Sequence, residues 1–97
     1  MIKVVKEDNK IEITGHANYD EYGKDIVCAS VSSIVITSIN ACLEFDEESI
    51  YYEDLENKIK IEIIKKDEIT EKLINNMVFM LESLERDYPK NIKILRR

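Results

Sequence analysis

The 97-residue chain is acidic, with a formal net charge of −6 and 35% charged residues. Its 44% hydrophobic content, two glycines and single proline indicate one compact, regularly folded domain over residues 1–97 and argue against disorder. The negative charge opposes direct binding to nucleic acid, whose phosphates are recognised mainly by Lys and Arg, and favours a basic protein or peptide as partner.

The chain opens with two short β-rich runs, residues 2–5 and 10–14, on either side of the turn-forming pair Asp8-Asn9. We therefore predict a β-hairpin. Charged residues replace the apolar core of a signal peptide in this segment, so secretion is not expected. We expect a cytoplasmic location, where both cysteines stay reduced and no disulfide framework forms.

A long helix is predicted next, beginning at Asp25 as its N-cap. Residues 26–43 contain no Lys, Arg, Asp or Glu, which is the length and composition of a membrane span. Six Ser, Thr and Asn residues are spread along the segment, so we expect a helix buried in protein and no membrane contact. Many β-branched residues favour a strand, but the length decides for a helix. The expected core stripe is Val27, Val31, Ile34, Ser38 and Cys42.

The second half repeats this pattern. Residues 49–53 and 57–64 predict another hairpin, the latter alternating Lys or Glu with Ile, so that one face of the sheet meets solvent. A helix over about 68–87 and a strand over 91–95 follow. The predicted stripe of this helix is Ile69, Leu73, Met77, Leu81 and Leu84. The fold class is therefore α+β, a single two-layer domain with a mixed sheet of about five strands, two helices on one face and the order ββαββαβ.

Residues 15–28 hold the only His, both glycines and one of the two cysteines, between a strand and a helix. With Asp25 as N-cap, Cys28 lies in the first helical turn, where unpaired N–H groups and the helix dipole stabilise a thiolate and an oxyanion. The carboxylate of Asp25 opposes that charge. We expect the imidazole of His16 to offset the penalty by taking the thiol proton.

Simpler interpretations compete with this one. A Cys is more often core packing than chemistry, and a lone His is usually a satisfied polar group. Tyr19 and Tyr22 either line a peptide groove or shield the loop. Ser32, one turn after the candidate thiol, either hydrogen-bonds near it or permits close helix packing. Cys42, deep in the helix, is assigned to packing. The acidic residues of segments 44–48 and 53–54 are interpreted as a solvated loop surface.

A metal site is poorly supported, because one His and two widely spaced Cys do not make a tetrahedral ligand set. We expect no metal and no cofactor.

The run Gly15-His16-Ala17, then Gly23, residues 25–29 and residues 31–32, resembles the signature of the ribosomal-processing cysteine protease family Prp of Firmicutes and related bacteria. Residues 88–90 and 92–94 are similar to the closing pattern of that family. Ser30 and Cys42 stand where smaller residues such as Ala or Gly are more usual. The resemblance implies a catalytic dyad of Cys28 and His16, supporting roles for Asp25 and Ser32, and loop-hinge roles for Gly15 and Gly23.

The resemblance also implies the substrate. Members of the family remove an N-terminal extension from large-subunit ribosomal protein number twenty-seven and form homodimers, so we expect that N-terminal peptide and a second copy of the chain as partners. The loop over residues 15–25 is expected to order when substrate binds. The alternative is a non-catalytic dimeric binding module for a ribosomal protein or assembly intermediate. Iodoacetamide labelling distinguishes the two, since only the enzyme needs an activated thiol.

Overall fold

The structure is a computed structural model that describes residues 1–15 and 22–97, without the side chains of residues 22–25. The elements, in chain order, are β1 (Ile2–Glu7), β2 (Lys10–Thr14), α1 (Tyr22–Phe45), β3 (Ile50–Leu55), β4 (Lys58–Ile63), α2 (Glu68–Asp87) and β5 (Ile92–Arg96). The predicted order ββαββαβ is confirmed. The largest difference in boundary is at α1, which begins at Tyr22, three residues before the predicted N-cap.

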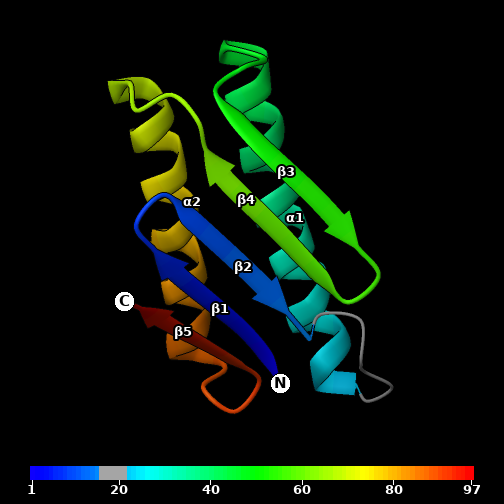
Figure 1. Ribbon diagram of the computed structural model, residues 1–97. Helices are drawn as coiled ribbons and strands as arrows, with labels where there is room; N and C mark the ends of the chain where they lie inside the picture. The colour runs from blue at the N-terminus through cyan, green and yellow to red at the C-terminus, as the bar shows by residue number, and fades with distance from the viewer. Residues whose placement is uncertain (16–21) are drawn as a thin grey trace.

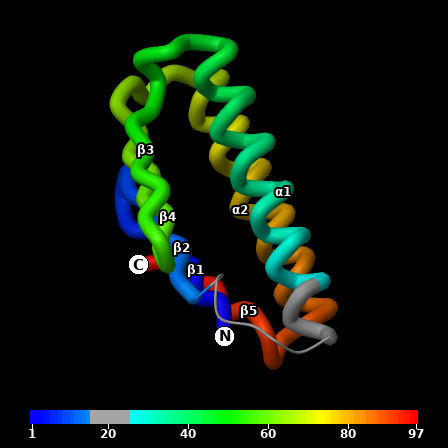
Figure 2. Tube along the Cα trace, turned by 90° about the vertical axis from the view of Figure 1, so that its right-hand side faces the viewer, coloured from blue at the N-terminus to red at the C-terminus, as the bar shows by residue number. Residues whose placement is uncertain are grey.

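The five strands form one mixed sheet in the order β3-β4-β2-β1-β5. β1 pairs in parallel with β5, and the other three pairings are antiparallel. Figure 1 shows α1 behind β3 and β4 and α2 behind β1 and β2, and Figure 2 shows both helices on the same side of the sheet. The predicted two-layer α+β domain is therefore confirmed.

The alternation of side chains along β4 places its apolar residues in the core. Ile59, Ile61 and Ile63 are buried between sheet and helices, and Lys60 between them is exposed on the opposite face. Since successive side chains of a strand point to opposite faces, this one pattern orients the whole strand. The predicted wet face of the sheet is confirmed.

The buried side of α1 differs in part from the predicted stripe. Val27, Val31 and Cys42 are buried as expected, but Ile34 is only half-buried and Ser38 donates its hydroxyl to the Ile34 carbonyl at 2.7 Å. Their places in the core are taken by Val35 and Ile39. A helix this apolar allows several stripes at helical spacing, and only its packing against the sheet and α2 selects one.

Residues Ile26–Phe45 are long and apolar enough to cross a membrane by length and composition alone. In the structure this helix supplies core residues that pack with those of the sheet and of α2. This packing accounts for part of the apolar composition, whereas Ile26, Ile36 and Phe45 of the same helix stay exposed.

The second helix, α2, begins at a classical polar cap. The carboxylate of Asp67 accepts hydrogen bonds from the backbone N–H and the hydroxyl of Thr70, at 2.8 and 3.0 Å. Met77 and Leu81 of the predicted stripe are buried, whereas Ile69 is 48% exposed. The buried residues of α2 are Thr70, Ile74, Met77, Val78 and Leu81. The face is thus rotated from the prediction, because α2 contacts both α1 and the sheet.

Candidate active site

Cys28, the predicted nucleophile, lies on the buried side of α1. Its side chain is 4% exposed and belongs to the core cluster together with Val27 and Val31. The thiol therefore sits in the layer between helix and sheet, shielded from bulk solvent. Such burial keeps the thiol from indiscriminate oxidation and alkylation, and requires that a substrate be admitted to it.

The helix start changes the local electrostatics from those predicted. With α1 beginning at Tyr22, Asp25 lies inside the helix and is not its N-cap, and Cys28 falls in the second turn. The N–H groups that lack an intrahelical acceptor are the first four, before Cys28. Because the dipole effect fades beyond the first turn, formation of a Cys28 thiolate depends more on a nearby proton acceptor than on the helix end.

An acidic residue is favourable both at the cap of a helix and within its first turn, which is why the sequence does not distinguish the two starts. The predicted base, His16, and Tyr19 lie outside the described residues, as do the side chains of Tyr22 and Asp25. Their roles, and the ordering of the loop by substrate, remain predictions.

Gly15 occupies the point where the chain leaves β2. Its φ is +84°, a backbone conformation that L side chains rarely adopt, and its N–H donates to the Asn57 carbonyl at 3.4 Å. A Cβ at this position would lie 2.3 Å from the carbonyl oxygen of Met1. Glycine is thus required here by both torsion and space. The segment that leads to His16 starts from a fixed position, between β1 and the β3–β4 turn.

Gly23, by contrast, lies within the first turn of α1. A helical residue does not need the angles that only glycine reaches, so the expected loop is shorter at this end than predicted. The hinge roles of Gly15 and Gly23 remain predictions.

Ser32 follows Cys28 by one turn of α1 and is half-buried. Residues four apart are neighbours on a helix surface, so its hydroxyl lies on the same side of α1 as the thiol. Both predicted roles of Ser32, hydrogen bonding near the thiol and close packing, are compatible with this placement.

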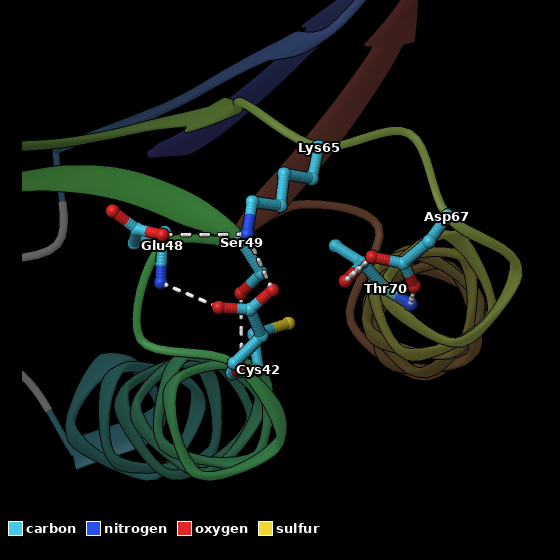
Figure 3. A network of polar contacts seen from close by, with 7 residues as sticks. Cys42, Glu48, Ser49, Lys65, Asp67 and Thr70 are labelled. Atoms are coloured by element: carbon cyan, nitrogen blue, oxygen red, sulfur yellow. Dashed lines mark hydrogen bonds and ion pairs between the residues drawn. The ribbon is translucent and has the colours of Figure 1, made fainter.

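Cys42 lies at the other end of α1, about 21 Å from Cys28 along the helix axis at 1.5 Å per residue. It is fully buried, and burial, followed by the negative charge of Asp67, raises the pKa of its thiol. The Ser49 hydroxyl donates to its backbone carbonyl at 2.9 Å (Figure 3). These contacts tie the end of α1 to β3, and the assignment of Cys42 to packing is confirmed.

The polar contacts around Cys42 belong to this structural junction. Lys65 reaches the carboxylates of Asp46 at 2.9 Å and Glu48 at 3.4 Å (Figure 3). The backbone N–H of Glu48, followed by Lys65, holds the pKa of Asp46 below its usual value. Segment 44–48 is therefore more than a solvated acidic surface. Through these contacts, Asp46 caps the turn that leads into β3. Among residues 1–15 and 22–97, no group of three or more His, Cys, Asp and Glu is arranged to hold a metal ion.

The comparisons with known proteins agree with this geometry. Residues 1–93 match the model of the cysteine protease Prp family. The chain is 34% identical to the ribosomal processing cysteine protease Prp of Bacillus subtilis, over 86% of this chain and 80% of that protein. It is 31% identical to the protein of the same name from Staphylococcus aureus, over 93% of this chain and 91% of that one.

Solved structures point the same way. The S. aureus ribosomal processing protease Prp in complex with a substrate peptide superimposes with a TM-score of 0.92 at 24% identity, with both chains covered completely. The same protease with a covalently linked product peptide gives a TM-score of 0.84 at 28% identity, again with complete coverage. The chain is a cysteine protease. It belongs to the Prp family.

The structure also reveals a feature that the sequence interpretation missed. Tyr52 and Asp54 lie on the outermost strand, β3, and line a cavity against α1 together with Ile36, Ile39, Asn40 and Ile59. The sequence interpretation places Asp54 in a solvated acidic loop, whereas it lies within β3, which ends at Leu55. No local pattern indicated that the strand continues past residue 53, because Asp is depleted in strands.

Proposed function

We propose that this protein is a cytoplasmic, homodimeric cysteine endopeptidase that removes the N-terminal extension of large-subunit ribosomal protein number twenty-seven during ribosome assembly. The observation that carries the proposal is the place of Cys28. Its thiol is buried on α1, between helix and sheet, and β2 of that sheet ends at Thr14, two residues before the predicted base His16.

The proposed reaction is acyl transfer. His16 takes the thiol proton, and the Cys28 sulfur attacks the scissile carbonyl carbon to form a tetrahedral oxyanion. Collapse of this intermediate breaks the C–N bond, and the imidazolium of His16 delivers its proton to the leaving amine. Water then attacks the thioester, His16 accepts a proton from the water, and the thiol is regenerated as the acid product leaves. No external oxidant, metal or cofactor enters this balance.

The substrate proposal has two supports. The relatives from B. subtilis and S. aureus are ribosomal processing proteases, and the S. aureus protein has been crystallised with substrate and product peptides. The net charge of −6 suits a basic ribosomal protein through long-range attraction.

The test is incubation of the purified protein with the full-length ribosomal protein of the same organism, followed by mass spectrometry of the product N-terminus. We expect one cut that releases a short N-terminal peptide. Cys28→Ala should abolish this cut and leave the fold intact. Cys42→Ala is the matched control, because it removes the other buried thiol of the same helix, and it should still cut.

Undiminished cleavage by Cys28→Ala would overturn the nucleophile assignment. An intact ribosomal protein after prolonged incubation with folded enzyme would overturn the substrate. If the protein bound that substrate without cutting it, the non-catalytic binding module would be the better description.

A further inference from the structure

β3 is an edge strand with an open hydrogen-bonding side. Ile64 donates its N–H to the Ser49 carbonyl at 2.9 Å, which makes Ser49 and Ile64 a hydrogen-bonded pair. Bonded and non-bonded pairs alternate in an antiparallel ladder, so Tyr51 and Glu53 also bond to β4. The backbone N–H and C=O groups of Tyr52 and Asp54 therefore point away from β4, and no strand of the described chain covers that side.

The same two residues border a cavity. The side chains of Tyr52 and Asp54 alternate with Tyr51 and Glu53, and so face the helix layer. There they enclose a cavity of about 190 Å³ with residues of α1 and β4 (Ile36, Ile39, Asn40 and Ile59). Ile36 is 55% exposed and Tyr52 is 43% exposed, so apolar surface on both walls of this cavity remains uncovered.

One residue of the cavity wall lies in the same row of α1 as the nucleophile. Cys28, Ser32 and Ile36 are spaced four apart, so they form one row on the helix surface. From Cys28 to Ile36 the row covers about 12 Å, at 1.5 Å per residue. β3 runs opposite to α1, starting near Cys42 and ending toward the N-terminal half of the helix (Figure 1). A distance of this length corresponds to about four residues of an extended chain.

The charges of β3 indicate which kind of partner binds to its open edge. Among the described residues, no Lys or Arg forms an ion pair with Asp54 or with its neighbour Glu53. Antiparallel pairing of two copies through β3, centred on these residues, would bring the carboxylates of both copies together, at a net charge of −6 each. A positively charged peptide faces no such repulsion and is attracted instead.

We infer that the substrate binds as a sixth strand on the open edge of β3, a step that rests on the proposed function and specifies how it is achieved. The occupant is an extended, basic peptide segment. Its backbone hydrogen-bonds to Tyr52 and Asp54, one apolar side chain fills the cavity beside Ile36, and the scissile bond lies about four residues further along, at Cys28. The edge selects for an unfolded N-terminal extension, because folded proteins offer few free strands of this length.

The test uses the full-length Cys28→Ala protein and a synthetic peptide that spans the N-terminal extension and cleavage bond of the same ribosomal protein. Amide hydrogen exchange by NMR should slow at least tenfold at Tyr52 and Asp54 on addition of peptide. Tyr51 and Glu53 are internal controls in the same strand, since their amides already bond to β4, and they should change little.

Substitutions on the active enzyme give a second readout. Ile36→Arg should raise KM at least tenfold with kcat nearly unchanged, because it blocks the cavity without touching the reacting atoms. Phe79→Arg is the matched control: Phe79 is 58% exposed on α2, away from the cavity, and its replacement should leave both constants unchanged.

The possible outcomes separate the strand addition at β3 from the proposed cleavage reaction. Cleavage of the ribosomal protein without slower exchange at Tyr52 and Asp54 would overturn the strand addition alone. Slower exchange with no cleavage by the active enzyme would support the edge and overturn the proposed reaction. If exchange at these amides slows as the protein concentration is raised, with no peptide present, a second copy of the chain covers the edge. That result would overturn the inference.

Discussion

Replacement of Gly15 by Ala should destabilise the protein more than any other single methyl addition at its surface. The φ of +84° costs an L-residue about 1–2 kcal/mol. The new Cβ would also lie 2.3 Å from the Met1 carbonyl oxygen, which must move away by nearly an ångström. That movement disturbs the start of β1, where Ile2 is buried and its N–H donates to the Asn91 carbonyl at 2.9 Å. A weakened hydrogen bond adds about 1 kcal/mol.

The expected total is a loss of about 2–3 kcal/mol in the free energy of unfolding, which lowers Tm by about 10–20 °C for a domain of this size. Urea and thermal unfolding followed by circular dichroism, at one protein concentration, measure the loss. Gly23→Ala is the control, because a glycine within a helix is replaced by the best helix former, and its stability should be equal or higher by up to about 1 kcal/mol. Equal stability of Gly15→Ala and the unmodified protein would refute the reasoning.

Three further predictions concern individual side chains. His16→Ala should lower the rate of cleavage roughly a hundredfold or more and flatten its pH dependence near neutrality, and an unchanged rate and profile would make His16 structural. Cys42 should react with iodoacetamide only after unfolding, because it is fully buried and its raised pKa leaves little thiolate at neutral pH; rapid labelling of the folded protein at Cys42 would contradict this. A hydrogen bond from Arg96 lowers the pKa of Glu82 from 4.5, so Glu82→Gln should cost about 0.5 kcal/mol at pH 7. This cost should disappear as the pH falls through the lowered pKa, where the unmodified carboxylate is also neutral, and a cost that stays constant down to pH 2 would exclude this ion pair as its origin.

Local patterns were sufficient for the elements themselves. The alternation of Lys and Glu with Ile along residues 58–63 dictates a strand with one wet face, and the acidic start and Tyr88-Pro89 end of α2 place its boundaries at Glu68 and Asp87. Both signals act between neighbours in sequence. The spacing of His16 and Cys28, within the run that resembles the Prp signature, similarly indicated a cysteine protease, and the family is confirmed.

Periodicity was less informative for the apolar helix α1. Val, Ile, Ala and Cys occupy nearly every side of it, so sequence did not distinguish a core stripe through Ile34 and Ser38 from the one through Val35 and Ile39. Its start was equally ambiguous, since an acidic residue such as Asp25 is favourable both at an N-cap and one turn later.

The remaining features depend on contacts between residues distant in the chain. Gly15 must be glycine because the carbonyl of Met1, fourteen residues earlier and just before the neighbouring strand β1, lies against it. The β3 edge is open because β3 is the outermost strand, with β4 and β2 between it and β1. The cavity beside Tyr52 exists only where α1 crosses that edge. A sequence records which residues are adjacent along the chain, and its periodicity shows which face each element buries. Which partners those faces meet is decided by the packing of helices and strands against each other, and that packing appears only in the tertiary structure.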